Sequence, residues 1–175
     1  IGIDGVDIST VLPKITTVSI ESQLRSRNSL VQLNDTIKEV WGDQLNPHSH
    51  MVEQADVSTH SRYTGRSVLR LFYSLHSAVQ STRNIMVPNA ASLESSMYWL
   101  RYLQNERVNV AFHQLFVEGM NDSPDEVQSI IDWMQQFPDS ELRVLRYNFC
   151  KNSPHAEWTG VDGAIRMLIE AGVRV

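Results

Sequence analysis

Apolar positions along the chain follow two alternating periods, which predict short strands separated by helices. Runs rich in β-branched and aromatic residues predict strands, and they cover residues 15–21, 52–59, 68–74, 108–117 and 142–148. Apolar residues spaced three and four apart predict helices, and these cover residues 30–41, 92–107, 123–137 and 161–171. The alternation amounts to about five βα units, which is typical of a parallel sheet with helices packed outside it. We therefore expect an α/β fold.

Two helix ends carry clear local signals. Ser123 can cap a helix, Pro124 suits its first position, and Glu126 is placed to complete a capping box. Gly172 is the expected C-cap of the last helix. The residues of that last helix that we expect to face the core are Ile165, Leu168 and Ile169.

Polar residues follow the predicted strands at their carboxyl ends, where parallel sheets bind ligands. They are Glu21 and Ser22, Ser58 and Thr59, Ser74 to His76, Glu118 to Asp122, and Asn148. These side chains are small and hydrogen-bonding. The pattern therefore predicts a site for a polar small molecule.

Length and composition indicate one globular domain. The 175 residues are 42% hydrophobic and 20% charged, which excludes a disordered or collagen-like chain. We predict a single domain over residues 1–175, in which residues 15–175 form a partial barrel and residues 1–14 stay unassigned. The net charge of −5 argues against a strongly basic nucleic-acid-binding protein.

No targeting signal is visible. No apolar run approaches about 18 residues, the length of a membrane-spanning helix, and no secretory signal opens the chain. We expect a cytoplasmic protein that makes no membrane contact. Ile1 in place of Met suggests a fragment or a processed form.

Other candidate chemistry is weaker. His48 and His50 have the spacing of a metal-binding pair on a strand, but no carboxylate or Cys is paired with them, so an exposed loop is the preferred interpretation. Ser58 and His60 are too close in sequence to indicate a catalytic dyad. Cys150 is the one cysteine of the chain and is interpreted as a partly buried thiol.

Several motifs occur in order along the chain. The segment Leu71–Ser77 contains a Ser-Leu-His triplet at residues 74–76 and is followed by Arg83 and then by Val87-Pro88-Asn89. Further on, Phe116–Ser123 reads as a strand followed by a Gly-x-Asn-Asp turn, and Leu145–Phe149 contains an Asn-Phe strand end. In this order and spacing, residues 55–175 resemble the radical-SAM RNA adenine methyltransferases, which methylate carbon 2 of adenine in rRNA and tRNA.

The resemblance implies a fold, a cofactor and a partner. The fold would be a partial parallel (β/α) barrel of the radical-SAM type, with S-adenosylmethionine (SAM) bound at its mouth and RNA as the substrate. Carried over motif by motif, the residues that would bind SAM are Ser58, Ser74, Leu75, His76 and Asn148. The family's Gly-Glu-Pro motif corresponds to the region of Glu21 and Ser22, where its Gly and its Pro are missing.

The chain also departs from the family at its iron–sulfur cluster. The family binds a four-iron–four-sulfur cluster through a Cys-x-x-x-Cys-x-x-Cys motif, in which three thiolates hold three irons and SAM chelates the fourth. Residues 1–20 contain no such motif, so this chain alone cannot support the cluster. Cys150 does not occupy the position of the family's methyl-carrying cysteine.

Three hypotheses of function remain open. The first is a truncated or diverged radical-SAM methyltransferase that keeps a SAM-shaped site. The second is a cluster-less, non-catalytic module that binds a nucleotide, RNA or a protein partner, and the loss of Gly-Glu-Pro favours it. The third is an unrelated α/β barrel enzyme, for which Glu21 and Glu118 would be the candidate acid–base carboxylates.

Overall fold

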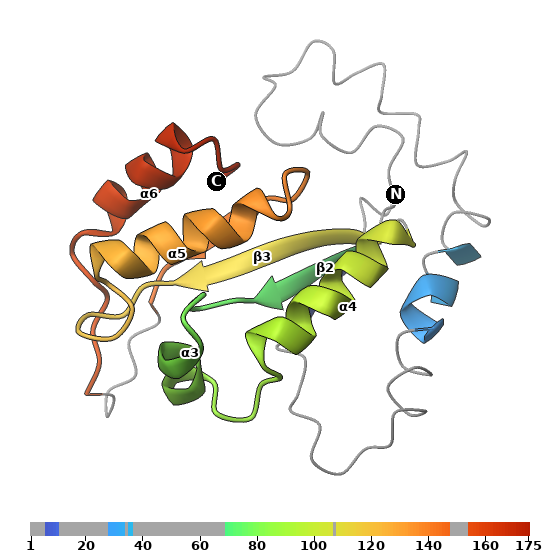
Figure 1. Ribbon diagram of the computed structural model, residues 1–175, viewed down its shortest axis with the longest axis horizontal. Helices are drawn as coiled ribbons and strands as arrows, with labels where there is room; N and C mark the ends of the chain where they lie inside the picture. The colour runs from blue at the N-terminus through green and yellow to red at the C-terminus, as the bar shows by residue number, and fades with distance from the viewer. Residues whose placement is uncertain (1–5, 11–27, 34, 37–68, 107, 148–153) are drawn as a thin grey trace, which may run out of the picture. The chain divides into compact units, whose positions relative to one another are not determined.

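The computed structural model describes residues 6–10, 28–33, 35–36, 69–106, 108–147 and 154–175 (Figure 1). The chain divides into two compact units. One unit comprises residues 1–8, 15–71 and 98–110, and the other comprises residues 9–14, 72–97 and 111–175.

Four strands form one sheet in the order β1-β2-β3-β4. Their bounds are Val6–Thr10 for β1, Leu69–Ser74 for β2, Asn109–Leu115 for β3 and Leu142–Leu145 for β4. β3 pairs with β4 in parallel, with Phe112 opposite Leu142 and Leu115 opposite Leu145. The arrows of β2 and β3 also point the same way in Figure 1. The carboxyl ends of these strands therefore lie at a common edge of the sheet.

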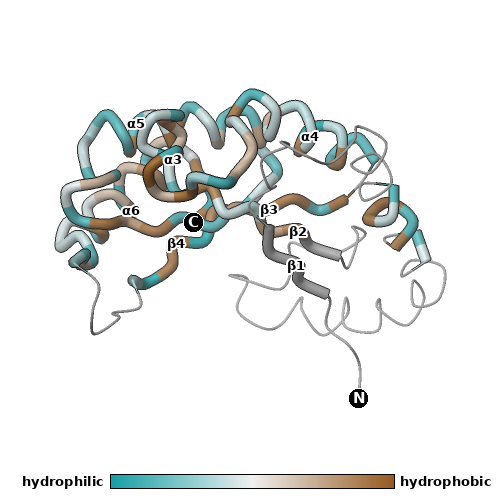
Figure 2. Tube along the Cα trace, turned by 90° about the horizontal axis from the view of Figure 1, so that it is seen from below, coloured by the Kyte–Doolittle hydropathy of each residue, from teal (hydrophilic) through white to brown (hydrophobic). Residues whose placement is uncertain are grey.

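Four helices connect and follow the strands. They are α3 (Gln80–Met86), α4 (Leu93–Asn105), α5 (Pro124–Gln135) and α6 (Val161–Glu170). α3 and α5 lie on the same side of the sheet in Figure 2, and α5 contacts α6. After α6 the chain turns at Gly172, whose φ is +81°, and Arg174 forms a parallel bridge with Glu141 beside β4.

The core of the second unit lies between β2, β3 and α5 and is built from aromatic rings. The ring of Phe112 meets those of Trp133 and Phe137 at centroid distances of 6.3 and 5.0 Å. Tyr73 stacks on Trp133 at 6.3 Å and donates a hydrogen bond to Ser96 at 2.9 Å. Offset and edge-to-face pairs of this kind add to the free energy that area burial alone provides.

In the first unit, the end of α4 and the start of β3 supply a smaller apolar cluster. Leu100, Leu103, Val108 and Val110 are buried there. Tyr98 lies on the same helix and is exposed. The first unit also includes a helical segment at residues 28–33 and 35–36, which begins two residues before the helix predicted over 30–41 and overlaps it.

The elements predicted over residues 68–171 are confirmed, each within a few residues of its bounds. The predicted strands at 15–21 and 52–59 lie outside the described residues. The sequence did not predict β1 or α3. The α/β class is confirmed, and the partial-barrel closure and the single domain stay predictions.

Two local predictions were wrong. Ile169 was expected to face the core but is 56% exposed, because Leu168 and Ala164 already fill the buried face of α6. Only half of the capping box forms. The Ser123 hydroxyl accepts a hydrogen bond from the Glu126 N–H at 3.2 Å, while the Glu126 carboxylate binds Ser77 instead.

The C-cap of α6 lies one residue before Gly172, where it was predicted. Ala171 is the cap, and Gly172 follows it in the left-handed region. The N–H groups of Gly172 and Val173 donate to the carbonyls of Ile169 and Leu168, both at 2.9 Å. This pair of bonds is the Schellman motif, which glycine favours because it lacks a Cβ.

Among the helices described, none combines the length and the apolar character needed to cross a membrane.

Candidate functional site at the carboxyl ends of the strands

The segment that follows β2 is held by its backbone carbonyls. Arg83, which is fully buried on α3, donates from Nη1 to the carbonyls of Ser74, at 2.8 Å, and of Leu75. Its guanidinium also lies over the Tyr73 ring, 4.8 Å from the centroid. The carbonyl bonds and the ring contact stabilise a charge that has been removed from water.

His76, the next residue, adopts a left-handed backbone conformation with φ of +57°. Its carbonyl accepts hydrogen bonds from the side-chain amides of Gln114, at 3.0 Å, and Asn121. Gln114 lies on β3 and Asn121 lies in the turn that follows β3. The end of β2 is therefore bonded to its neighbouring strand through side chains as well as through the sheet.

The turn after β3 owes its shape to Asn121. The Asn121 Oδ1 accepts from the Val117 N–H at 2.7 Å, and its Nδ2 donates to the Leu115 carbonyl at 2.6 Å. Gly119 adopts a φ of +72° in this turn, and its N–H donates to Asp122 at 2.8 Å. The Gly-x-Asn-Asp sequence thus supplies both the left-handed turn residue and the side chains that close the turn.

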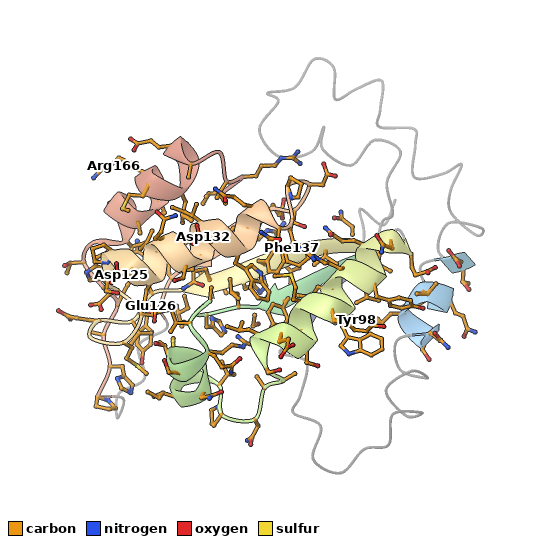
Figure 3. All side chains as sticks on the ribbon, viewed as in Figure 1. Tyr98, Asp125, Glu126, Asp132, Phe137 and Arg166 are labelled. Carbon is orange, nitrogen blue, oxygen red and sulfur yellow. The ribbon has the colours of Figure 1, made fainter. Side chains whose placement is uncertain are left out.

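A second polar contact fixes the segment from the side of α5. The Ser77 hydroxyl donates to the Glu126 carboxylate at 2.7 Å, and both residues are buried. The Val79 N–H donates to the same hydroxyl at 2.9 Å. Glu126 lies in the first turn of α5 (Figure 3), where the helix dipole favours a negative charge.

The environment of His76 keeps its imidazole neutral. Burial lowers the pKa of His76 to about 4, and the nearby Arg83 and His113 lower it in the same direction. The Nδ1 atom of His76 is buried and has no hydrogen-bond partner among the residues described. A neutral imidazole presents one donor and one acceptor nitrogen, so it is equipped to bind a polar group without adding positive charge.

The end of β4 is tied to the end of β3 by Glu157. The Glu157 carboxylate accepts from the Tyr147 N–H at 2.9 Å and pairs with Arg146 at 2.6 Å. Its backbone forms an antiparallel bridge with Val117. The ends of β3 and β4 are therefore held side by side at the same edge of the sheet.

The structure brings together only part of the predicted site. Ser74, Leu75 and His76 lie at the end of β2, next to the Asn121 turn at the end of β3. Ser58, Asn148, Glu21 and Ser22 lie outside the described residues, so their predicted role stays a prediction. His48, His50 and Cys150 also lie outside them.

Sequence reasoning missed most of the residues that support this segment. Ser77 and Gln114 were not singled out, and Glu126 was assigned only to a helix cap. The available signal was a polar residue inside an otherwise apolar strand, since Gln114 is fully buried in β3. Asn121 and Arg83 were noted as motif residues without a structural role.

The residues present do not fit an iron–sulfur cluster of the family type. Such a cluster needs three thiolates from the protein, and the sequence contains one cysteine. Within the described ranges, no group of three or more His, Cys, Asp or Glu side chains is arranged to hold a metal ion. We therefore derive no chemical step through a cluster.

Comparison with known proteins supports the relationship that the motifs indicate. No family model matches the chain. A probable RNA methyltransferase of Rhodopirellula baltica is 30% identical over 96 residues, which cover 50% of this chain and 24% of the relative. The chain thus spans about a quarter of the length of that curated relative.

The fold has a solved counterpart. A radical SAM methyltransferase from Sphaerobacter thermophilus superposes with a TM-score of 0.53 at 17% identity, over 61% of this chain and 32% of the other. At that identity the likeness concerns the fold. The chain is thus similar in sequence to part of a probable RNA methyltransferase and in fold to part of a radical SAM methyltransferase, as the motifs predicted.

Proposed function

We propose that the segment Ser74–His76 is part of a SAM-binding site and that the chain is a piece of a methyltransferase acting on RNA. The observation that carries the proposal is the His76 imidazole, which is neutral and has a buried Nδ1 atom without a partner among the described residues. The names of the two relatives, an RNA methyltransferase and a radical SAM methyltransferase, support the same assignment.

The charge of SAM explains why a neutral histidine suits this position. SAM carries a sulfonium cation, and a protonated imidazole nearby would repel it. A His76 pKa of about 4 leaves the ring uncharged throughout the physiological range. The ring can then form a hydrogen bond with a polar group of the ligand without repelling the sulfonium cation.

Further binders are proposed from the motifs. Ser74 and Leu75 would contribute alongside His76, and Ser58 and Asn148 would come from other strand ends. Glu21 and Ser22 would hold the methionine end of the ligand, in the place of the family's Gly-Glu pair. When bound, SAM supplies the methyl group; the residues of this chain bind and orient it.

Isothermal titration calorimetry with SAM tests the proposal. We expect the protein to bind SAM, and we expect His76→Asn to weaken binding at least ten-fold, which corresponds to about 1.4 kcal/mol. Asparagine tolerates the left-handed conformation of residue 76, so this variant removes the ring and keeps the backbone. The matched control is His155→Asn, at an exposed histidine outside residues 74–77, which begin at the last residue of β2 and which we call the strand-end segment. Wild-type protein that binds no SAM would contradict the proposal.

A second candidate function is an RNA-binding module without catalysis. The missing Gly and Pro of the Gly-Glu-Pro motif favour it, because a working SAM site should retain that motif. Titration with short RNA hairpins separates the two candidates. RNA binding in the absence of any SAM binding would favour the module.

A further inference from the structure

The backbone of His76 is the least expected feature of the strand-end segment. Among the described residues, it is the one non-glycine residue with a positive φ, at +57°. A left-handed conformation is sterically unfavourable for an L-residue with a Cβ. Such a conformation persists only when the surrounding structure over-determines it, and it is found preferentially at functional sites.

The two peptide planes that flank His76 are each fixed by a buried side chain. The preceding plane carries the Leu75 carbonyl, which accepts from Arg83. The following plane carries the His76 carbonyl, which accepts from Gln114 and Asn121. Since φ and ψ are the rotations between these two planes and the Cα atom, holding both planes fixes the conformation of His76.

Gln114 makes one other hydrogen bond among the contacts described, to the carbonyl of its neighbour Leu115. Its Nε2 donates to the carbonyls of His76 and Leu115, at 3.0 and 3.1 Å, and its Oε1 has no partner within the described part of the chain. Burying a side-chain amide in a strand costs free energy unless hydrogen bonds replace those that it made to water. Its donor group is therefore the part of Gln114 that the fold uses.

We propose that Gln114 and Asn121, together with Arg83, are positioning residues that hold His76 in the left-handed conformation required for ligand binding. They act through the backbone of residue 76 and touch no ligand. This inference rests on the proposed function, because it assigns them a role in the same SAM site. It adds to that site residues that the resemblance does not assign as binders.

Two near-isosteric substitutions remove the donors. Gln114→Met removes the Nε2 donor and sacrifices no bond at Oε1. Asn121→Asp keeps an oxygen for the Val117 N–H and removes the donor to the His76 carbonyl. Gln128→Met is the matched control, because Gln128 is exposed on α5 and bonds only to Asp132 among the contacts described.

Two measurements on the full chain are compared at a temperature where every variant is folded. The first is the NMR cross-peak between the amide proton and the Hα of His76, which is intense only when φ is positive. The second is the dissociation constant for SAM by calorimetry. We expect the double variant Gln114→Met/Asn121→Asp to lose the intense cross-peak and to bind SAM at least ten-fold more weakly. Gln114→Met alone should show a smaller change in both, and Gln128→Met neither.

The outcomes separate this inference from the proposed function. Wild-type protein that binds no SAM refutes the proposed function, and the cross-peak then decides by itself whether the amides hold His76. A double variant that retains the intense cross-peak overturns the inference. So does a double variant that loses the cross-peak but binds SAM as tightly as the wild type.

Discussion

Two buried regions of the second unit adjoin the same helix, α5. One consists of packed aromatic rings, and the other consists of hydrogen-bonded polar side chains. Between α5 and the sheet, the rings of Phe112, Trp133 and Phe137 pack against one another. At the beginning of the same helix, Glu126 bonds to Ser77 in a segment that also buries the guanidinium of Arg83. We call the first region the aromatic core and the second, residues 74–77 with Arg83, Gln114, Asn121 and Glu126, the polar clamp.

The two regions differ in what they contribute to the fold: the aromatic core contributes stability, and the polar clamp contributes a defined local conformation. The aromatic core gains free energy from area removed from water, which depends on size and not on individual atoms. The polar clamp gains little net free energy, because its hydrogen bonds replace bonds to water. Its hydrogen bonds are directional, so they fix the positions of the atoms that they join and thereby the conformation of the segment. Stability should therefore depend on the core, and the shape of the strand-end segment on the clamp.

The largest effect is expected in the aromatic core. Phe112→Ala should lower the free energy of unfolding by about 3–5 kcal/mol, because it leaves a cavity against two other rings. Urea denaturation followed by tryptophan fluorescence measures the change. Ile85→Ala, at a side chain that is 72% exposed, is the control and should change stability by less than about 0.5 kcal/mol. A loss below about 1 kcal/mol at Phe112 would show that the core relaxes around the cavity.

The aromatic core was largely predictable from the sequence. The apolar spacing of α5 is a local property, and Val127, Ile130 and Met134 are buried as their period requires. The start of the helix at Pro124 follows from its cap and its proline. Gly172 likewise ends α6 through bonds within a few residues.

The polar clamp was not predictable by the same means. Ser77 and Glu126 are separated by 49 residues, and His76 and Asn121 by 45. The pairing of such residues is a property of the tertiary fold, and no local period encodes it. The capping-box prediction for Glu126 failed for this reason, because a distant serine competed successfully for its carboxylate. The motif resemblance located His76 and Asn121, but it gave no reason for them to meet.

A smaller effect is expected within the polar clamp. Ser77→Ala removes the donor to Glu126 and the acceptor for the Val79 N–H. It should cost about 1–3 kcal/mol, because the buried Glu126 carboxylate and the Val79 N–H both lose this partner and no water replaces it. Ser129→Ala is the control, since its hydroxyl bonds to a backbone carbonyl on the exposed side of α5.

A double-mutant cycle with Glu126→Gln shows how much of that cost belongs to the pair. We expect the two changes to be non-additive by at least about 0.5 kcal/mol, because the residues are in direct contact. Additive effects would mean that Ser77 matters for the turn at Val79 and not for its bond to α5.

The smallest effect is the pH dependence that His76 adds to stability. Its pKa is about 4 in the folded protein against 6.5 for the free side chain, so between these values the unfolded state binds more protons. Stability from this residue is therefore complete above pH 6.5 and is lost as the pH falls towards 4. The shift corresponds to about 3–4 kcal/mol at most, and because the ring is not fully buried we expect on the order of 1–2 kcal/mol.

His76→Asn isolates this contribution from the other histidines of the chain. The free energy of unfolding of the wild type and of the variant should be measured by urea denaturation at intervals between pH 4 and pH 7. The wild type should lose more stability as the pH falls from 7 to 4, because it has a buried imidazole at residue 76 that gains a proton more readily in the unfolded state. The variant has no titratable group at that position. Burial is the largest cause of the lowered pKa of His76, and Arg83 on α3 and His113 on β3 lower it further. Parallel curves for the two proteins would mean that the His76 ring is already solvated in the folded state, and the polar clamp would then leave residue 76 as free to titrate as an exposed histidine.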